Sequence, residues 1–256
     1  MLLPARFMNR LLRFKLRRRT LPPLAAANLD ALDHLDITRP AASYTYTVVD
    51  LETTGLDTRK SSVVSIGAFK VIDGRIHLGR MFDQLVNPGH TVVSEAIKVH
   101  GLVPSMLVSA PSGPEALDRF LTFLGSDIMV AHPAWFDIAF LNRLMLARYG
   151  FRLQNIVIDS RLLCERLLLP HILPLPRKPG LQENRITNPA RSFPTANLET
   201  ISQHLGIRIY RRHSATGDAL ATAMILQRCL MKLKQNGQEQ LGDLIRVGTL
   251  GLMNTK

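Results

Sequence analysis

Two carboxylates separated by one residue, Asp50 and Glu52, follow the apolar run Tyr46–Val49 and precede a Thr-Thr-Gly turn. In an extended strand, residues i and i+2 point to the same face, so we expect both acids to project together from the strand's end. Carboxylates held that close repel each other unless a cation lies between them. The pair fits a divalent-metal site, although an isolated pair of this kind is also typical of a solvated strand end.

Two further acids lie near the starts of expected helices. Asp137 follows Ala131-His132-Pro133 and lies one turn into a helix, where an acid also complements the helix dipole. Asp218 lies on an otherwise apolar helix, in which an unpaired carboxylate is costly. His213 precedes that helix and can lean over the same site. Together with the first pair, these residues indicate an acidic cluster with one histidine.

The elements that would position these residues alternate along the chain. We expect strands at 44–51, 62–72 and 75–86, because Asp73-Gly74 between β-rich runs is a strong hairpin signal. Further strands are expected at 127–131 and 154–158, and helices at 94–100, 114–124, 133–149, 160–168, 197–205 and 214–234. The order predicts an α/β fold, in which helices flank a mixed sheet made of an antiparallel three-stranded meander plus parallel strands.

The chain divides into three expected parts. Residues 1–43 form a basic N-terminal arm and linker, 44–235 form the folded domain with a Pro-rich inserted loop at 169–195, and 236–256 form a C-terminal tail. Within the tail, Gln240–Ile245 fits a terminal amphipathic helix or, less well, a sliding-clamp-binding peptide. With 256 residues and 46% hydrophobic content, the chain can build one sizeable core with extensions.

The formal net charge of +12 suits a polyanionic partner, and it is also compatible with simple solubility. The first 20 residues contain no acid and these basic residues: Arg6, Arg10, Arg13, Lys15, Arg17, Arg18 and Arg19. Such a stretch fits a flexible arm for nucleic acid or a partner, a membrane-surface helix, or a cleaved mitochondrial targeting peptide.

Cysteine usage and hydropathy bear on the location of the protein. Cys164 and Cys229 both lie in apolar helical patterns without disulfide or zinc spacing, which indicates a reducing compartment. No apolar run approaches the roughly 18 residues that a membrane span needs. We therefore expect a cytoplasmic protein with no membrane span, and leave mitochondrial targeting open.

Three motifs resemble, in order, those of the DnaQ-like (DEDDh) 3′→5′ exonucleases, a family that includes the proofreading epsilon subunit of bacterial DNA polymerase III. The motifs are Val49–Gly55, Ala131–Asp137 and His213 with Asp218-Ala219, and the resemblance covers about residues 44–235. It implies an RNase H-like fold, hydrolysis of phosphodiester bonds from a 3′ end, and release of nucleoside 5′-monophosphates.

The resemblance also implies cofactors and roles for individual residues. Two divalent ions, Mg²⁺ or Mn²⁺, would be held by Asp50, Glu52, Asp137 and Asp218, and His213 would take the proton from the attacking water. The terminal nucleotide would contact Thr53, Thr54, Gly55, Leu56, Val99, His100, His132 and Phe136. These contact positions also fit a structural turn and core packing. Pro133 departs from the asparagine that the family commonly has after this histidine.

The implied substrate is a single-stranded or frayed 3′ end, with DNA favoured, and the implied role is proofreading or repair. A DNA polymerase is one partner that the resemblance suggests. The same motifs suit an RNA-trimming 3′→5′ exoribonuclease, because both nucleic acids present the same phosphodiester. A third alternative is a non-catalytic nucleic-acid-binding adaptor that retains the fold.

Overall fold

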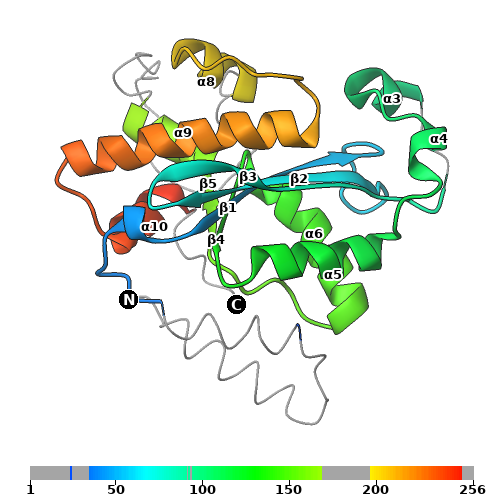
Figure 1. Ribbon diagram of the computed structural model, residues 1–256, viewed down its shortest axis with the longest axis horizontal. Coiled ribbons are helices and arrows are strands. Elements are labelled where there is room, and N and C mark those ends of the chain that lie inside the picture. The colour runs from blue at the N-terminus through cyan, green and yellow to red at the C-terminus, as the bar shows by residue number, and fades with distance from the viewer. Residues whose placement is uncertain (1–23, 25–34, 91, 93, 169–196, 250–256) are drawn as a thin grey trace, which may run out of the picture.

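A computed structural model gives the arrangement of the chain (Figure 1) and describes residues 24, 35–90, 92, 94–168 and 197–249. The basic stretch in residues 1–20 and the expected Pro-rich loop at 169–195 lie outside the described residues. Among those that are described, no helix combines the length and the apolar content needed to cross a membrane.

A five-stranded mixed sheet forms the centre of the body, with the strand order β3-β2-β1-β4-β5. The strands β1 (Tyr46–Thr53), β2 (Val63–Ile72) and β3 (Arg75–Leu85) form an antiparallel meander. Two further strands, β4 (Ile128–Ala131) and β5 (Val157–Asp159), run parallel to β1. The predicted mixed sheet is confirmed.

The turn between β2 and β3 has the predicted hairpin geometry. Asp73 and Gly74 have φ angles of 49° and 70°. Positive φ at both central residues matches the twist of the flanking strands, which explains the Asp-Gly pair in the sequence.

Helices cover both faces of the sheet (Figure 1). The long helix α9 (Ala215–Gln235) packs on β1 and β2 from one side. On the other side lie α5 (Gly113–Leu124) and α6 (Ala134–Tyr149), whose buried residues form a second core cluster.

The alternation of side chains along β1 decides which layer the acids meet. Tyr46 and Val48 belong to the core cluster that contains the buried face of α9, whereas Val49 and Leu51 belong to the cluster under α5 and α6. Asp50 and Glu52 follow Val48 in steps of two, so they lie on the α9 face.

Shorter helices complete the fold. α3 (Ser94–His100) and α4 (Pro104–Leu107) follow β3, and α8 (Leu198–His204) packs beside α9. The helix predicted at 160–168 is α-helical only in α7 (Ser160–Leu163) and continues as a π-helical turn at Cys164–Leu168.

Two strands differ in extent from the prediction. β1 continues to Thr53, because its pairing with β2 persists beyond a register shift at Glu52/Thr53. The strand predicted at 154–158 begins only at Val157. Before it, the Asn155 side chain donates hydrogen bonds to the carbonyls of Gly125 (3.0 Å) and Asp127 (2.8 Å), which ties this backbone down as a loop.

The segment expected as a tail, 236–256, contributes a helix to the folded body. α10 (Leu241–Gly248) fully buries Leu241 and Leu244 in the same core cluster as α9. Residues 36–43, expected as linker, also belong to the body, because Ala41 is buried and Gly242 N donates to the Ile37 carbonyl at 2.8 Å. The amphipathic-helix interpretation of Gln240–Ile245 is confirmed.

Candidate active site

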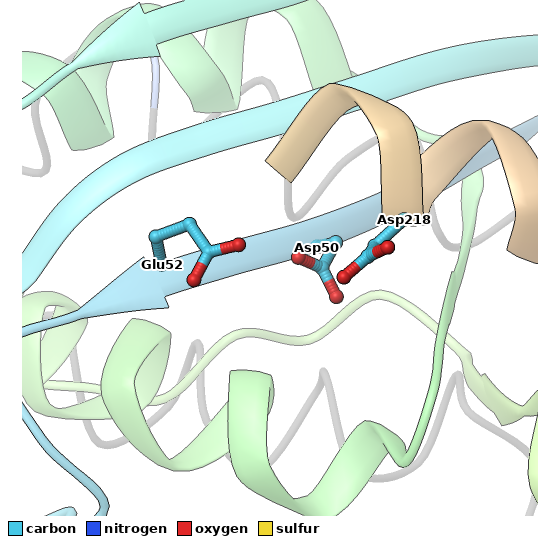
Figure 2. Close-up of side chains that lie close together, drawn as sticks. All are labelled: Asp50, Glu52 and Asp218. Carbon is cyan, nitrogen blue, oxygen red and sulfur yellow. The ribbon is translucent and has the colours of Figure 1, made fainter. Parts of the chain in front are cut away.

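Three carboxylates converge between β1 and α9. Asp50, Glu52 and Asp218 each offer an oxygen, and these oxygens lie within 4.8 Å of one another. Figure 2 shows Asp50 and Glu52 extending from the strand while Asp218 reaches them from the helix. Asp218 is only 3% exposed, and its Oδ1 has no hydrogen-bond partner among the described residues. A buried carboxylate oxygen without a partner is costly, so a cation bound at the cluster would satisfy it.

Burial and mutual repulsion raise the pKa values of this cluster. Burial, and then the charges of the neighbouring acids, raise the pKa of Asp50 well above its usual range. Burial and the charge of Asp218 raise the pKa of Glu52 to about 7. Burial also raises the pKa of Asp218, against the opposing effect of the Arg212 guanidinium. Acids in this state gain strongly from a bound divalent cation.

Asp137 lies outside the group of three carboxylates but close enough for its charge to act on Asp50. It is 2% exposed, and its Oδ1 accepts a hydrogen bond from the Leu51 backbone N at 3.1 Å. Burial raises its pKa well above the usual range. The bond ties the first turn of α6 to β1 between Asp50 and Glu52, so it sets the distance between the two elements.

The start of α6 shows how the chain accommodates Pro133. Proline has no side chain that can cap a helix, and none caps α6 from that position. Asp159, at the end of β5, accepts a hydrogen bond from Ala134 N at 3.2 Å instead. Burial raises the pKa of Asp159 to about 6. The neighbouring strand therefore supplies the cap that residue 133 cannot.

His132 is held by a short chain of hydrogen bonds. Its Nδ1 lies 2.8 Å from Ser160 Oγ, and that hydroxyl donates to the Ala131 carbonyl at 3.0 Å. Because the hydroxyl hydrogen is already used, His132 Nδ1 is the donor of the pair. These bonds fix the ring orientation in the wall of the site.

The loop before α9 brings His213 over the cluster. Ser214 caps α9 by accepting a hydrogen bond from Gly217 N at 3.2 Å, and its hydroxyl donates to the Arg211 carbonyl at 2.6 Å. A Cβ on Gly217 would lie 2.2 Å from the Tyr210 carbonyl oxygen, so only glycine lets this loop close onto the helix. His213 is exposed, with a φ of 61°.

The turn after β1 is rigid, and its tip is exposed. Thr53 Oγ1 donates to the Gly55 carbonyl at 2.8 Å, and Thr54 N donates to the Ser62 carbonyl at 2.8 Å. From α6, the Arg143 guanidinium donates to the Thr58 carbonyl at 2.7 Å, which holds the same loop. Leu56 at the tip is 85% exposed.

All of the candidate residues from the sequence line one cleft of about 880 Å³. They come from β1 and its turn, α3, the start of α6, and the loop and first turn of α9: Asp50, Glu52, Thr53, Thr54, Gly55, Leu56, Val99, His100, His132, Phe136, Asp137, His213 and Asp218. On α3, burial lowers the pKa of His100, whose Nδ1 accepts from Leu102 N at 3.0 Å. Segments far apart in the sequence thus meet at one concave surface.

Residues 47–226 match the model of a family described as an exonuclease, RNase_T. The chain belongs to this exonuclease family. The matched residues include β1, α6 and the first turn of α9, which carry the candidate acids and His213.

Relatives of this chain include two bacterial proteins. The DNA polymerase III subunit epsilon of Aquifex aeolicus (strain VF5) is 31% identical over 189 residues, which is 74% of this chain and 82% of the relative. A DNA polymerase III subunit epsilon-like protein of Rhodobacter capsulatus is 34% identical over 209 residues, or 80% of this chain. The match spans only 26% of the Rhodobacter capsulatus protein's own length.

A solved structure supports the fold assignment. E. coli exonuclease I, in complex with a dT13 oligonucleotide, aligns with a TM-score of 0.58 at 16% identity, over 76% of this chain and 42% of that chain. The likeness shows the shared architecture, so the predicted RNase H-like fold is confirmed.

The sequence analysis missed two basic residues that line the cleft, Arg161 and Arg212. Arg161 Nε donates to Glu165 at 2.8 Å. Arg212 donates from Nη1 to Asp218 Oδ2. The run Arg211-Arg212-His213 beside an acidic motif was a usable signal, because a cation that close to buried acids tends to pair with them.

Proposed function

We propose that this chain is a metal-dependent 3′→5′ exonuclease that hydrolyses DNA from its 3′ end and releases nucleoside 5′-monophosphates. The observation that carries the proposal is the convergence of Asp50, Glu52 and Asp218 within 4.8 Å, in a cleft that His213 also lines. Clustered acids do not suit a surface that only binds a polyanion, because they repel phosphate.

The donor set fits two divalent ions such as Mg²⁺ or Mn²⁺. Carboxylate oxygens are the ligands that these hard cations prefer, and Asp218 Oδ1 lacks a partner among the described residues. We assign Asp50, Glu52 and Asp218 as ligands, and Asp137, which lies outside that group of three, as the fourth ligand. When bound, the ions neutralise the phosphodiester charge and lower the pKa of the attacking water.

His213 is the proposed general base. A neutral imidazole carries one nitrogen without a proton, which can accept the proton of the attacking water and pass it to solvent. The close approach of the loop to Gly217 fixes the backbone of His213, while its exposed ring can turn into the cleft. Solvent access then allows the ring to lose the proton after each cycle.

The 3′-terminal nucleotide is proposed to lie between the turn after β1 and α3. The bonded turn Thr53–Gly55 presents backbone groups to the terminal hydroxyl, and Leu56, Val99 and Phe136 offer apolar surface to the last bases. Leu56 and Val99 are 85% and 53% exposed, so their apolar side chains are available to a ligand. His100 and His132 complete the wall of this subsite.

DNA is the proposed substrate because the similar proteins carry DNA polymerase III names. The same names support a DNA polymerase as partner and a proofreading or repair role. We propose a cytoplasmic location. The free, buried thiols of Cys164 and Cys229 are in keeping with a reducing compartment.

Digestion of 5′-labelled single-stranded DNA and RNA of one sequence, with Mg²⁺ or Mn²⁺, tests the proposal. We expect a DNA ladder that shortens from the 3′ end, lost in Asp50→Ala and retained in Asp83→Ala, which removes an exposed acid on β3. A ladder on RNA alone would change the substrate to RNA. Equal activity in Asp50→Ala would reject the active site.

Strand binding can be followed separately from cleavage. Trp135, the one tryptophan of the chain, is 44% exposed, and its ring centroid lies 5.7 Å from that of Phe136 in the cleft wall. A change in its fluorescence on adding DNA would report binding by the inactive Asp50→Ala variant. Binding by the wild type without any ladder on DNA or RNA would favour the adaptor alternative.

A further inference from the structure

Arg212 places a positive charge inside the acidic cluster. Its guanidinium donates from Nη1 to Asp218 Oδ2, and both side chains line the cleft. Asp218 also supplies an oxygen to the group formed with Asp50 and Glu52. The guanidinium therefore holds Oδ2 of Asp218, while Oδ1 has no partner among the described residues, and its charge lies next to the place where a divalent cation would bind.

The effect of Arg212 extends beyond its direct partner. Burial raises the pKa values of Asp50, Glu52 and Asp218, and the positive charge of Arg212 lowers all three. A fixed cation is thus available to offset the repulsion among these carboxylates before any metal enters.

The backbone around Arg212 is fixed. The residues on either side, Arg211 and His213, have φ angles of 56° and 61°. Ser214 Oγ donates to the Arg211 carbonyl at 2.6 Å, and the loop lies against Gly217 so closely that no Cβ fits there. The start of the Arg212 side chain therefore stays in place while its end can move.

The Arg212 guanidinium itself is held by a single acceptor among the described residues. Among the described residues, Asp218 is the one acceptor that it contacts, and its Nε has no hydrogen-bond partner. The side chain is 31% exposed. Lys70 shows the contrast, because its ammonium contacts Asp127, Thr47 Oγ1 and the Phe123 carbonyl, and its side chain is only 13% exposed. The Lys70 ion pair is supported by two further contacts of the ammonium, whereas the Arg212 ion pair has no such support among the described residues and can break more easily.

We propose that Arg212 is a displaceable counter-ion of the acidic cluster: it pairs with Asp218 Oδ2 in the metal-free protein and leaves this pair when a divalent cation binds, because two cations at one carboxylate repel each other. The freed guanidinium stays at the cleft wall, where the phosphates of a bound strand are its next acceptors. The inference rests on the proposed metal-dependent function, and it assigns a positioning role to a residue outside the carboxylate set.

Calorimetric titration of the full chain with Mn²⁺ tests the inference through metal affinity. Arg212→Gln should bind Mn²⁺ about tenfold more tightly than the wild type, the factor expected when one charge-assisted hydrogen bond of about 1.4 kcal/mol no longer competes. Arg211→Gln makes the same change of charge at an exposed neighbour and should stay within about twofold of the wild type. Arg212→Lys, which keeps the charge, should return most of the wild-type affinity.

Stability without metal gives a second readout. In the presence of a chelator, Arg212→Gln should unfold at a lower temperature than Arg211→Gln, because the carboxylates then repel without a counter-ion. Excess Mn²⁺ should remove this difference.

The two ways of failing are distinct. Equal Mn²⁺ affinities for Arg212→Gln and Arg211→Gln, or weaker binding by Arg212→Gln, would overturn the counter-ion role and leave the metal site intact. A wild type that binds no Mn²⁺ would overturn the proposed function together with this inference.

Discussion

Gly67 on β2 lies directly opposite Asp50 on β1, and a Cβ at Gly67 would lie 2.3 Å from the backbone of α9 at Ala215 and Thr216. The side chains of paired residues on antiparallel strands lie on the same face, so the side chain missing from Gly67 is the space that α9 occupies. Asp218 reaches Asp50 because two backbones touch at this glycine.

Gly67→Ala should therefore separate the acids. A methyl group cannot fit against the α9 backbone, so the helix must shift, and displacements of about 1 Å can cost about 100-fold in rate. We expect a loss of at least this size in exonuclease activity, together with weaker Mn²⁺ binding by calorimetry. Gly79→Ala on β3 meets nothing within 4 Å and should behave as the wild type. Unchanged Mn²⁺ affinity in Gly67→Ala would show that the contact at Gly67 does not position Asp218 against Asp50.

The stability of the metal-free protein should fall as pH rises. Glu52 titrates near its ordinary value of 4.5 when unfolded and at about 7 when folded, so the folded state binds more protons between these values. The contribution of Glu52 to stability is therefore fully present below about pH 4.5, and it is lost as the pH rises to about 7. Asp50, Asp137 and Asp218 act in the same direction.

Thermal unfolding across this window, with chelator and with Mg²⁺, measures the effect. Glu52→Gln should flatten the chelator curve, and Mg²⁺ should raise stability most at the alkaline end, where the carboxylates are charged. A chelator curve that rises steadily with pH in the wild type would contradict the expected sign.

Leu56→Ala should weaken substrate binding without affecting the fold. The side chain is 85% exposed at the tip of a bonded turn, so it contributes little to the core. Losing an apolar contact with the last base should raise KM about threefold to tenfold, with kcat nearly unchanged. Leu146→Ala, on the outer part of α6 and 46% exposed, is the control in steady-state kinetics on DNA. Equal KM values for the two variants would remove Leu56 from the binding surface.

Leu244→Ala tests whether α10 belongs to the folded unit. Leu244 is fully buried against the α9 core cluster, so its truncation should lower the free energy of unfolding by about 2–5 kcal/mol. Leu78→Ala, at a 63% exposed site on β3, should change it by less than about 0.5 kcal/mol. Chemical denaturation measures both. An unchanged free energy of unfolding in Leu244→Ala would mean that α10 contributes nothing to the stability of the folded body.

The sequence was most informative where periodicity and chemistry coincide. Asp50 and Glu52 at a spacing of two on an apolar strand predicted a shared face, and Asp73-Gly74 predicted the hairpin. Asp218 was identifiable because a carboxylate in an apolar helix calls for a partner. These conclusions depend on local rules that the tertiary structure did not override.

Other features depend on contacts between distant segments, which no local pattern specifies. The late start of β5 follows from Asn155 bonding to carbonyls near the start of β4. The capping of α6 by Asp159 compensates for Pro133 from another strand. Likewise, Arg212 enters the cluster only because the loop folds onto Gly217. Asn155 and Asp159 act through side-chain hydrogen bonds, whereas the loop at Gly217 depends on a close approach of backbone atoms.

The segment by which the chain enters the described body is joined to the loop between α9 and α10. Ala41 N donates to the Glu239 carbonyl at 2.6 Å, and Leu241 N donates to the Arg39 carbonyl at 2.9 Å. Figure 1 shows α10, which follows this junction, at the opposite end of the molecule from α3, which lines the cleft. A pull on the chain before residue 36 would therefore load this junction before it reached β1. The junction thus separates the strand that carries Asp50 and Glu52 from tension on the N-terminal side of the body.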